Sequence, residues 1–218
     1  MTIDFSQITV VGLDIDDTVT DKNGVVLWPD PAGWIDRIGI QYPHLEWFYG
    51  SNQGGAAWQH FNETQMGSHK ITALPTPDTI YTRLHALRVG LETLTNKTAW
   101  IVTSYAYRFK KPFTLSEKNN VVLERQIAFN DSLLYWPSLH PTIPTRHFIY
   151  DNRPKPSGDI VRAGAGIYGE SDMTRVLFIG DADGTVFDYY DNPRFEDVNE
   201  AKSVGCHFRT PSQLWGNL

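Results

Sequence analysis

The stretch Ile8-Thr-Val-Val-Gly-Leu-Asp-Ile-Asp-Asp-Thr18 decides the fold class. Its first six residues are nearly all apolar or small, which is typical of a strand covered on both faces, as in a parallel sheet. Asp14 and Asp16 follow this strand directly. Because alternate residues of an extended chain point the same way, both carboxylates can reach one site as the chain leaves the sheet.

Three more short apolar runs predict strands, and each ends in small, hydroxyl-bearing or acidic residues: 99–102, 147–150 and 175–179. Leucine and isoleucine recur at one-face helical spacing from Ile80 to Leu94, which predicts a helix there. Further helices are expected over 115–127, 159–168 and 197–204, the last ending at Gly205. This alternation predicts an α/β fold, a Rossmann-like parallel sheet flanked by helices.

Residues 20–74 show no clear periodicity and are rich in Gly, Trp, Tyr, His and Asn. A structureless loop of that length is improbable inside a compact domain. We therefore expect a small cap insertion over 20–74, after the first strand, with the catalytic core formed by residues 1–19 and 75–218.

Composition narrows the function classes. The 218 residues are 41% hydrophobic, which excludes disorder of the whole chain, and the net charge of −6 disfavours a protein that coats nucleic acid. The single cysteine, Cys206, excludes a disulfide framework. No apolar run approaches the roughly 20 residues that span a bilayer, and the polar N-terminus is unlike a secretory signal. We expect a cytoplasmic protein with no membrane partner.

The residues after the predicted strands indicate a phosphate-handling metal site. Asp14, Asp16 and Asp181 would offer the oxygen ligands that Mg²⁺ prefers, because Asp181 also follows a strand. Bound metal would neutralise phosphate charge and let a carboxylate attack phosphorus. The Thr103 hydroxyl can donate to a phosphoryl oxygen, and Lys155 can offset charge in the transition state.

Four ordered motifs carry a resemblance to a known family: Asp14-x-Asp16-x-Thr18, Thr103 after a strand, Lys155-Pro156 and Gly180-Asp181. Together they resemble the motifs of the haloacid dehalogenase superfamily of phosphohydrolases. The match covers about two thirds of the chain and leaves out the predicted cap.

The resemblance implies a role for each matched residue. Asp14 would be the nucleophile that forms an aspartyl-phosphate, and Asp16 the general acid and then base. Thr103, with its neighbour Ser104, and Lys155 would bind phosphate. Asp14, the backbone carbonyl of Asp16, and Asp181 would hold Mg²⁺.

The last motif departs from the common pattern, because Thr185 and Val186 occupy the positions where a second acid is expected. Asp183 is our first choice for that metal-site acid. Asp197 is the second, on the interpretation that 182–196 is an insertion, and Asp188 is the third.

The predicted function is therefore a phosphatase, a Mg²⁺-dependent phosphomonoester hydrolase acting through an aspartyl-phosphate on Asp14. Its substrate would be a small phosphorylated molecule. One alternative is a polynucleotide 3′-phosphatase acting on a 3′-phosphorylated nucleic-acid end, because residues 180–184, Asp197 and 208–215 are similar to the end of those enzymes. A second alternative is a non-catalytic phosphate- or metal-binding relative.

Overall fold

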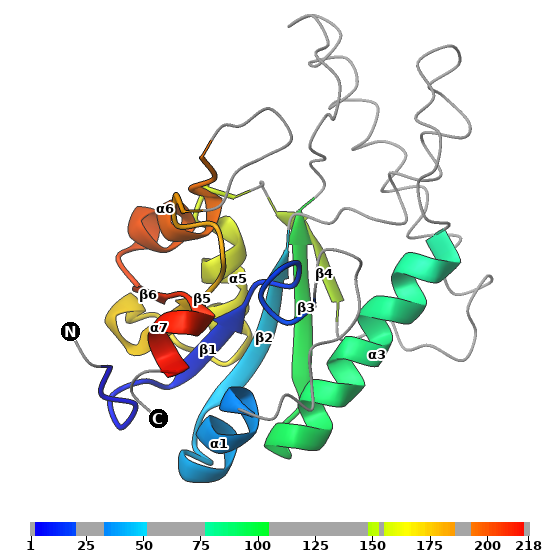
Figure 1. Ribbon diagram of the computed structural model, residues 1–218, viewed down its shortest axis with the longest axis horizontal. Coiled ribbons are helices and arrows are strands. Elements are labelled where there is room, and N and C mark those ends of the chain that lie inside the picture. The colour runs from blue at the N-terminus through cyan, green and yellow to red at the C-terminus, as the bar shows by residue number, and fades with distance from the viewer. Residues whose placement is uncertain are drawn as a thin grey trace, which may run out of the picture.

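The computed structural model describes residues 3–20, 33–51, 77–104, 148–152, 155–185 and 193–215. The described residues form a single parallel sheet of six strands in the order β4-β3-β2-β1-β5-β6, with helices on both faces (Figure 1). The strands are β1 (Val10–Leu13), β2 (Glu46–Ser51), β3 (Ala99–Ser104), β4 (Phe148–Asn152), β5 (Val176–Ile179) and β6 (His207–Arg209). The predicted Rossmann-like α/β fold is confirmed.

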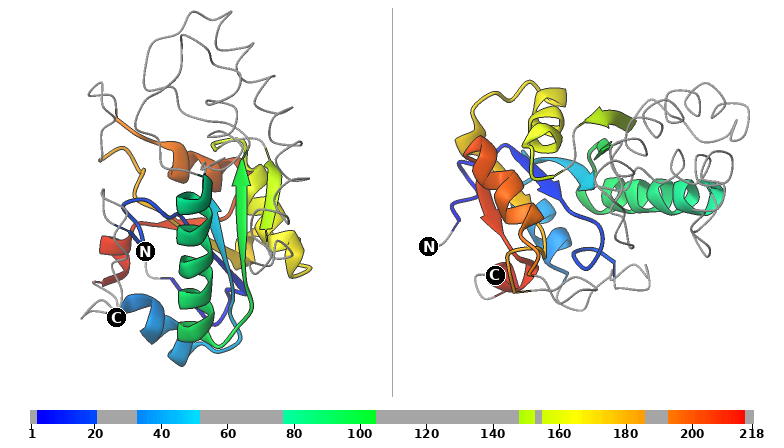
Figure 2. Two further views of the ribbon diagram at one scale, coloured as in Figure 1. Left: turned by 90° about the vertical axis from the view of Figure 1, so that its right-hand side faces the viewer. Right: turned by 90° about the horizontal axis from the view of Figure 1, so that it is seen from above.

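The helices fall into two layers. On one face lie α1 (Trp34–Gln41), α3 (Pro77–Thr95) and the short α7 (Pro211–Trp215), and on the other lie α5 (Asp159–Ile167) and α6 (Glu196–Val204). The 3₁₀ turn η3 (Met173–Arg175) leads into β5. Figure 2 shows α3 and α5 on opposite sides of the sheet. Within the described residues, no helix combines the length and apolar character that crossing a membrane would require.

Strand residues alternate between the two layers. Val11 and Leu13 of β1 pack with the first layer, whereas Val10 packs with the second. Gly12 faces the second layer, where the rings of Phe48 and Phe178 stack with centroids 6.5 Å apart. A Cβ at Gly12 would lie 2.4 Å from the Phe48 ring, so this central strand needs glycine there.

Part of the range 20–74, which the sequence predicted to be a cap, belongs to the core. α1 packs against α3, and β2 lies between β1 and β3 with Trp47, Phe48 and Tyr49 at most 1% exposed. The expected boundaries are corrected accordingly. The aromatic run Glu46–Ser51 has the composition expected of a cap, whereas its burial on both faces is that of a central strand. Residues 21–32 and 52–74, like the helix expected over 115–127, lie outside the described residues.

The strand order creates a switch point beside β1. The chain adds β2, β3 and β4 on one side of β1, then crosses to place β5 on its other side. Ligands of open α/β sheets bind at the carboxyl ends of the strands where the order reverses. The carboxyl ends of β1 and β5 are therefore where a site is expected.

Candidate active site

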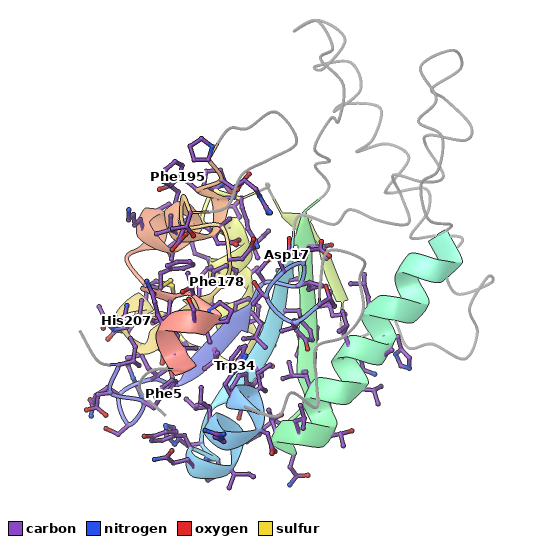
Figure 3. All side chains as sticks on the ribbon, in the orientation of Figure 1. Phe5, Asp17, Trp34, Phe178, Phe195 and His207 are labelled. Carbon is purple, nitrogen blue, oxygen red and sulfur yellow. The ribbon has the colours of Figure 1, made fainter. Side chains whose placement is uncertain are left out.

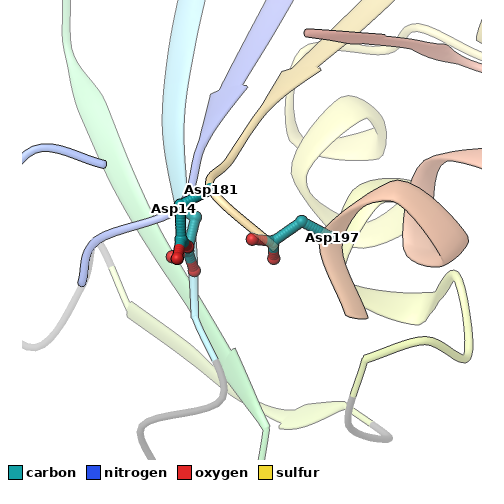
Figure 4. Close-up of side chains that lie close together, drawn as sticks. All are labelled: Asp14, Asp181 and Asp197. Atoms are coloured by element: carbon teal, nitrogen blue, oxygen red, sulfur yellow. The ribbon is translucent and has the colours of Figure 1, made fainter. Parts of the chain in front are cut away.

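Three buried carboxylates meet at the switch point. Asp14 directly follows β1, Asp181 follows β5 by two residues, and Asp197 comes from the first turn of α6. One oxygen of each lies within 4.8 Å of the other two. Figure 4 shows Asp197 projecting from the start of α6 toward Asp14 and Asp181. The exposed fractions are only 6%, 8% and 2%.

The parallel pairing of β1 and β5 brings Asp14 and Asp181 together. Leu13 pairs with Ile179, and the Asp14 N–H donates to the Ile179 carbonyl at 2.8 Å. A tight turn follows Asp14, in which Asp17, labelled in Figure 3, takes a left-handed conformation with φ of 60°. The N–H groups of residues 18, 19 and 20 all point to the Ile15 carbonyl, at 2.9–3.3 Å. This turn keeps Asp16 next to the end of β1, half-buried.

Asp197 is held in place from two sides. Its Oδ2 accepts the Ala182 N–H at 3.0 Å, and its Oδ1 accepts the Lys155 ammonium at 2.7 Å. A Cβ on Gly180 would lie 2.5 Å from Asp197 Oδ2, so the carboxylate can approach the β5 end only because residue 180 is glycine. The glycine before Asp181 thus makes room for the third acid.

Lys155 joins two of these acids. Its Nζ donates to Asp14 Oδ1 as well as to Asp197 Oδ1, and it lies 4.9 Å from the centroid of the Phe178 ring. Only 6% of Lys155 is exposed. Burial lowers the pKa of Lys155, but the carboxylates of Asp14 and Asp197 outweigh that effect and raise it above its ordinary value. The lysine is therefore a fixed positive charge in the site.

Burial and neighbouring charges shift the pKa values of two of these carboxylates, Asp14 and Asp181. Burial, followed by the charge of Asp197, raises the pKa of Asp14 well above its ordinary value, against the opposing effect of Lys155. Burial raises the pKa of Asp181 to about 6, although Arg194, 3.4 Å from its Oδ2, acts in the opposite direction. With all groups ionised, these three acids and two bases leave one net negative charge. Buried like charges of this kind favour a bound cation.

The donor set fits a hard divalent cation. Asp181 Oδ1 is buried and has no hydrogen-bond partner in the part of the chain that the structure describes. A buried carboxylate oxygen without a donor calls for a ligand. The candidate ligands are all carboxylate oxygens, which suits Mg²⁺ and does not suit a soft metal. A divalent cation would accordingly be held by Asp14, Asp181 and Asp197.

Among the described residues, the structure does not bring Asp183, the preferred second acid, into this cluster. The Asp183 carboxylate accepts the N–H and the hydroxyl of Thr185, at 2.9 and 2.6 Å, in a local turn. Asp197, the second choice, does lie in the cluster. The chain returns toward β5 before it: the Gly184 N–H donates to the Arg194 carbonyl and the Val198 N–H to the Ala182 carbonyl. Asp188 lies outside the described residues.

The remaining predicted residues, Thr103 and Ser104, lie at the same carboxyl end of the sheet. Thr103 is fully buried near the end of β3, with β2 between it and β1. Ser104 is the last residue of β3, and its side chain is outside the described set. Arg194 was not predicted, since nothing in its surrounding sequence marks it as a site residue.

Comparisons with known proteins add little to this geometry. The sequence matches no protein-family model and no curated protein. Two solved structures show a distant likeness: a single-mutant thermostable NPPase from Geobacillus stearothermophilus, 11% identical with a TM-score of 0.35, and Bs-TpNPPase, 11% identical with a TM-score of 0.34. Each likeness covers 93% of this chain and 87% of the other. The assignment of the site rests on its own residues.

Proposed function

We propose that the chain is a Mg²⁺-dependent phosphomonoester hydrolase of the haloacid dehalogenase type, with Asp14 as its nucleophile. The observation that carries the proposal is the buried group of Asp14, Lys155, Asp181 and Asp197 at the switch point of a parallel sheet. One lysine set among three carboxylates provides both a nucleophile and the positive charge that a phosphoryl group needs.

Asp14 would be the nucleophile of an in-line attack on phosphorus. Lys155 engages its Oδ1, which leaves Oδ2 to form a bond to phosphorus. The bond between phosphorus and the leaving oxygen breaks as Asp16 donates a proton to that oxygen, giving an aspartyl-phosphate on Asp14. Asp16 follows Asp14 by two residues and is half-buried, which suits a group that must exchange protons with substrate and water.

The second half of the reaction hydrolyses the aspartyl-phosphate and regenerates the free enzyme. Asp16 removes a proton from a water molecule, which attacks phosphorus and releases inorganic phosphate from Asp14. Lys155 stays protonated throughout and balances charge on the phosphoryl oxygens. Asp14, Asp181 and Asp197 would hold Mg²⁺, which would supply further neutralisation of the phosphoryl charge.

The proposal is tested with an aryl phosphate as a generic substrate. The wild-type protein should hydrolyse it only when Mg²⁺ is present, and Asp14→Asn should lower turnover by at least about a thousandfold. Asp172→Asn is the matched control, because this exposed carboxylate caps η3 at the opposite end of the sheet. Full activity in a folded Asp14→Asn variant would overturn the mechanism.

A nucleic-acid 3′ end is the second candidate substrate. Its support is the position of Asp197, because an acid that follows a long insertion is part of the similarity to polynucleotide 3′-phosphatases. A 3′-phosphorylated oligonucleotide and a panel of nucleotides and sugar phosphates should be compared at several salt concentrations. Preference for the oligonucleotide, weakening steeply with salt, would favour this candidate, and preference for a small phosphate ester would reject it.

A further inference from the structure

Glu200 is a buried acid that the proposed chemistry does not use. It lies one helical turn after Asp197 on α6 and is 0% exposed. Its Oε2 accepts the Gly158 N–H at 2.7 Å, and its Oε1 accepts the N–H groups of Ile160 and Val161 at 3.1 and 3.3 Å. A buried carboxylate is therefore committed to three backbone donors of another segment.

Those donors belong to the start of α5. The N-cap residue of α5 is Gly158, which has no side chain to satisfy the first free N–H groups of the helix. Glu200 takes over that capping role from α6. Its negative charge also lies at the positive end of the α5 dipole, which favours the arrangement.

The capped segment is the one that carries Lys155. Only two residues separate Lys155 from Gly158, and both ends of this short turn are fixed to α6. Lys155 binds Asp197 at 2.7 Å, and Gly158 binds Glu200 at the same distance. Because Asp197 and Glu200 are three residues apart, they lie on the same face of α6.

We call the two contacts, Lys155 with Asp197 and Gly158 with Glu200, the clamp. Packing of the turn against α6 reinforces it. Gly158 has a φ of 83°, and a Cβ there would lie 2.5 Å from both Ser203 Oγ and Val204 Cγ1 of α6. The turn thus sits directly against the helix. Because Gly158 follows Lys155 by only three residues, we expect movement of Gly158 away from α6 to weaken the contact of Lys155 with Asp14.

We propose that Glu200 is a positioning residue that holds the Lys155 ammonium between Asp14 and Asp197. The inference rests on the proposed function for its catalytic consequence, because Lys155 is there the phosphate-binding cation. Its structural content, the dependence of Lys155 burial on Glu200, is independent of any activity.

The test is Glu200→Gln. Glutamine keeps one acceptor oxygen but turns an NH₂ group toward a backbone N–H, so either the bond from Gly158 or the bonds from Ile160 and Val161 are lost. We expect the rate at which Lys155 reacts with an amine-specific reagent to rise about tenfold relative to exposed Lys202, as read by peptide mass spectrometry. The inhibition constant for inorganic phosphate should rise by a similar factor.

Glu170→Gln is the matched control. The Glu170 carboxylate also accepts a backbone N–H, that of Asp172, and the hydroxyl of Thr9, but it lies at the amino end of the sheet. Gly158→Ala is the second variant, because it displaces the turn from α6 while Glu200 stays intact. It should expose Lys155 as Glu200→Gln does, whereas Glu170→Gln should leave it protected.

The outcomes separate this inference from the proposed function. Unchanged Lys155 labelling in either folded variant, or an equal rise in Glu170→Gln, would overturn the positioning role. If Lys155 becomes reactive but the wild-type protein hydrolyses no phosphate ester, the clamp is supported and the proposed function fails.

Discussion

Replacing Asp197 by Asn should remove about half or more of the stabilisation that the protein gains from Mg²⁺. Asp197 is 2% exposed, and one of its oxygens lies within 4.8 Å of oxygens of Asp14 and Asp181. Asparagine keeps the shape and can still accept the Ala182 N–H, while Lys155 keeps Asp14 as a partner. The substitution therefore removes one charge from the metal site with little change in packing.

The expected size follows from linkage. At a Mg²⁺ concentration about a hundred times the wild-type dissociation constant, bound metal stabilises the folded state by about 2.7 kcal/mol. For a chain of this length that corresponds to a rise of roughly 5–10 °C in Tm. Mutation of a residue that only supports a metal ligand weakens metal affinity by about 10–100-fold, so loss of the Asp197 ligand charge should weaken it at least that much. The gain should then fall to about 1.4 kcal/mol or less.

The assay is thermal unfolding during a Mg²⁺ titration, with Asp183→Asn as the matched control. Asp183 is also a carboxylate of the β5–α6 connection, but it bonds to Thr185 in a local turn. We expect Asp183→Asn to keep the wild-type Mg²⁺ response. A lost response in Asp183→Asn together with a retained response in Asp197→Asn would refute the choice of Asp197.

Two further predictions concern stability. Burial raises the pKa of Asp181 to about 6, so the folded state binds its proton more tightly than the unfolded state, and stability is lost as pH rises from about 4 through 6. Without metal, Asp181→Asn should unfold at the same urea concentration as wild type below about pH 4. Above about pH 6 the variant should be more stable than wild type, by up to about 3 kcal/mol. A stability difference that stays constant with pH would contradict this. Gly12→Ala should lower the free energy of unfolding by about 1–3 kcal/mol in the same assay, because the alanine Cβ would lie 2.4 Å from the Phe48 ring. A change under about 0.5 kcal/mol would disprove this steric conflict.

Much of the sheet could be predicted from short apolar runs. The strands β1, β3, β4 and β5 lie where such runs predicted them, since a strand buried on both faces needs continuous apolar residues. β2 could not be recognised in the same way. Its sequence, Glu46-Trp-Phe-Tyr-Gly-Ser51, resembles a binding loop in composition, and only the pairing with β1 and β3 shows it to be central.

The site residues that could be predicted are those that follow an apolar strand run closely, Asp14 and Asp181. Asp14 and Asp181 lie close together because β1 pairs with β5. The choice between Asp183 and Asp197 could not be made from the sequence, because it depends on how the chain folds back after β5. Sequence distance favours the nearer acid, whereas α6 brings the farther one back through its contact with Ala182. Glu200 had no local signal, because its partners lie some 40 residues earlier on α5.

A trapped phosphoryl-enzyme would test the central claim most directly. Asp16→Asn should slow release of phosphate from Asp14 more than formation of the adduct, because water needs a base to attack whereas an aryl oxide can leave without a proton. After incubation with an aryl phosphate and Mg²⁺ and an acid quench, this variant should carry the mass of one phosphoryl group on the peptide that contains Asp14. The same adduct should be missing from Asp14→Asn. An adduct on another residue, or an adduct that persists in Asp14→Asn, would contradict the assignment of Asp14 as the nucleophile.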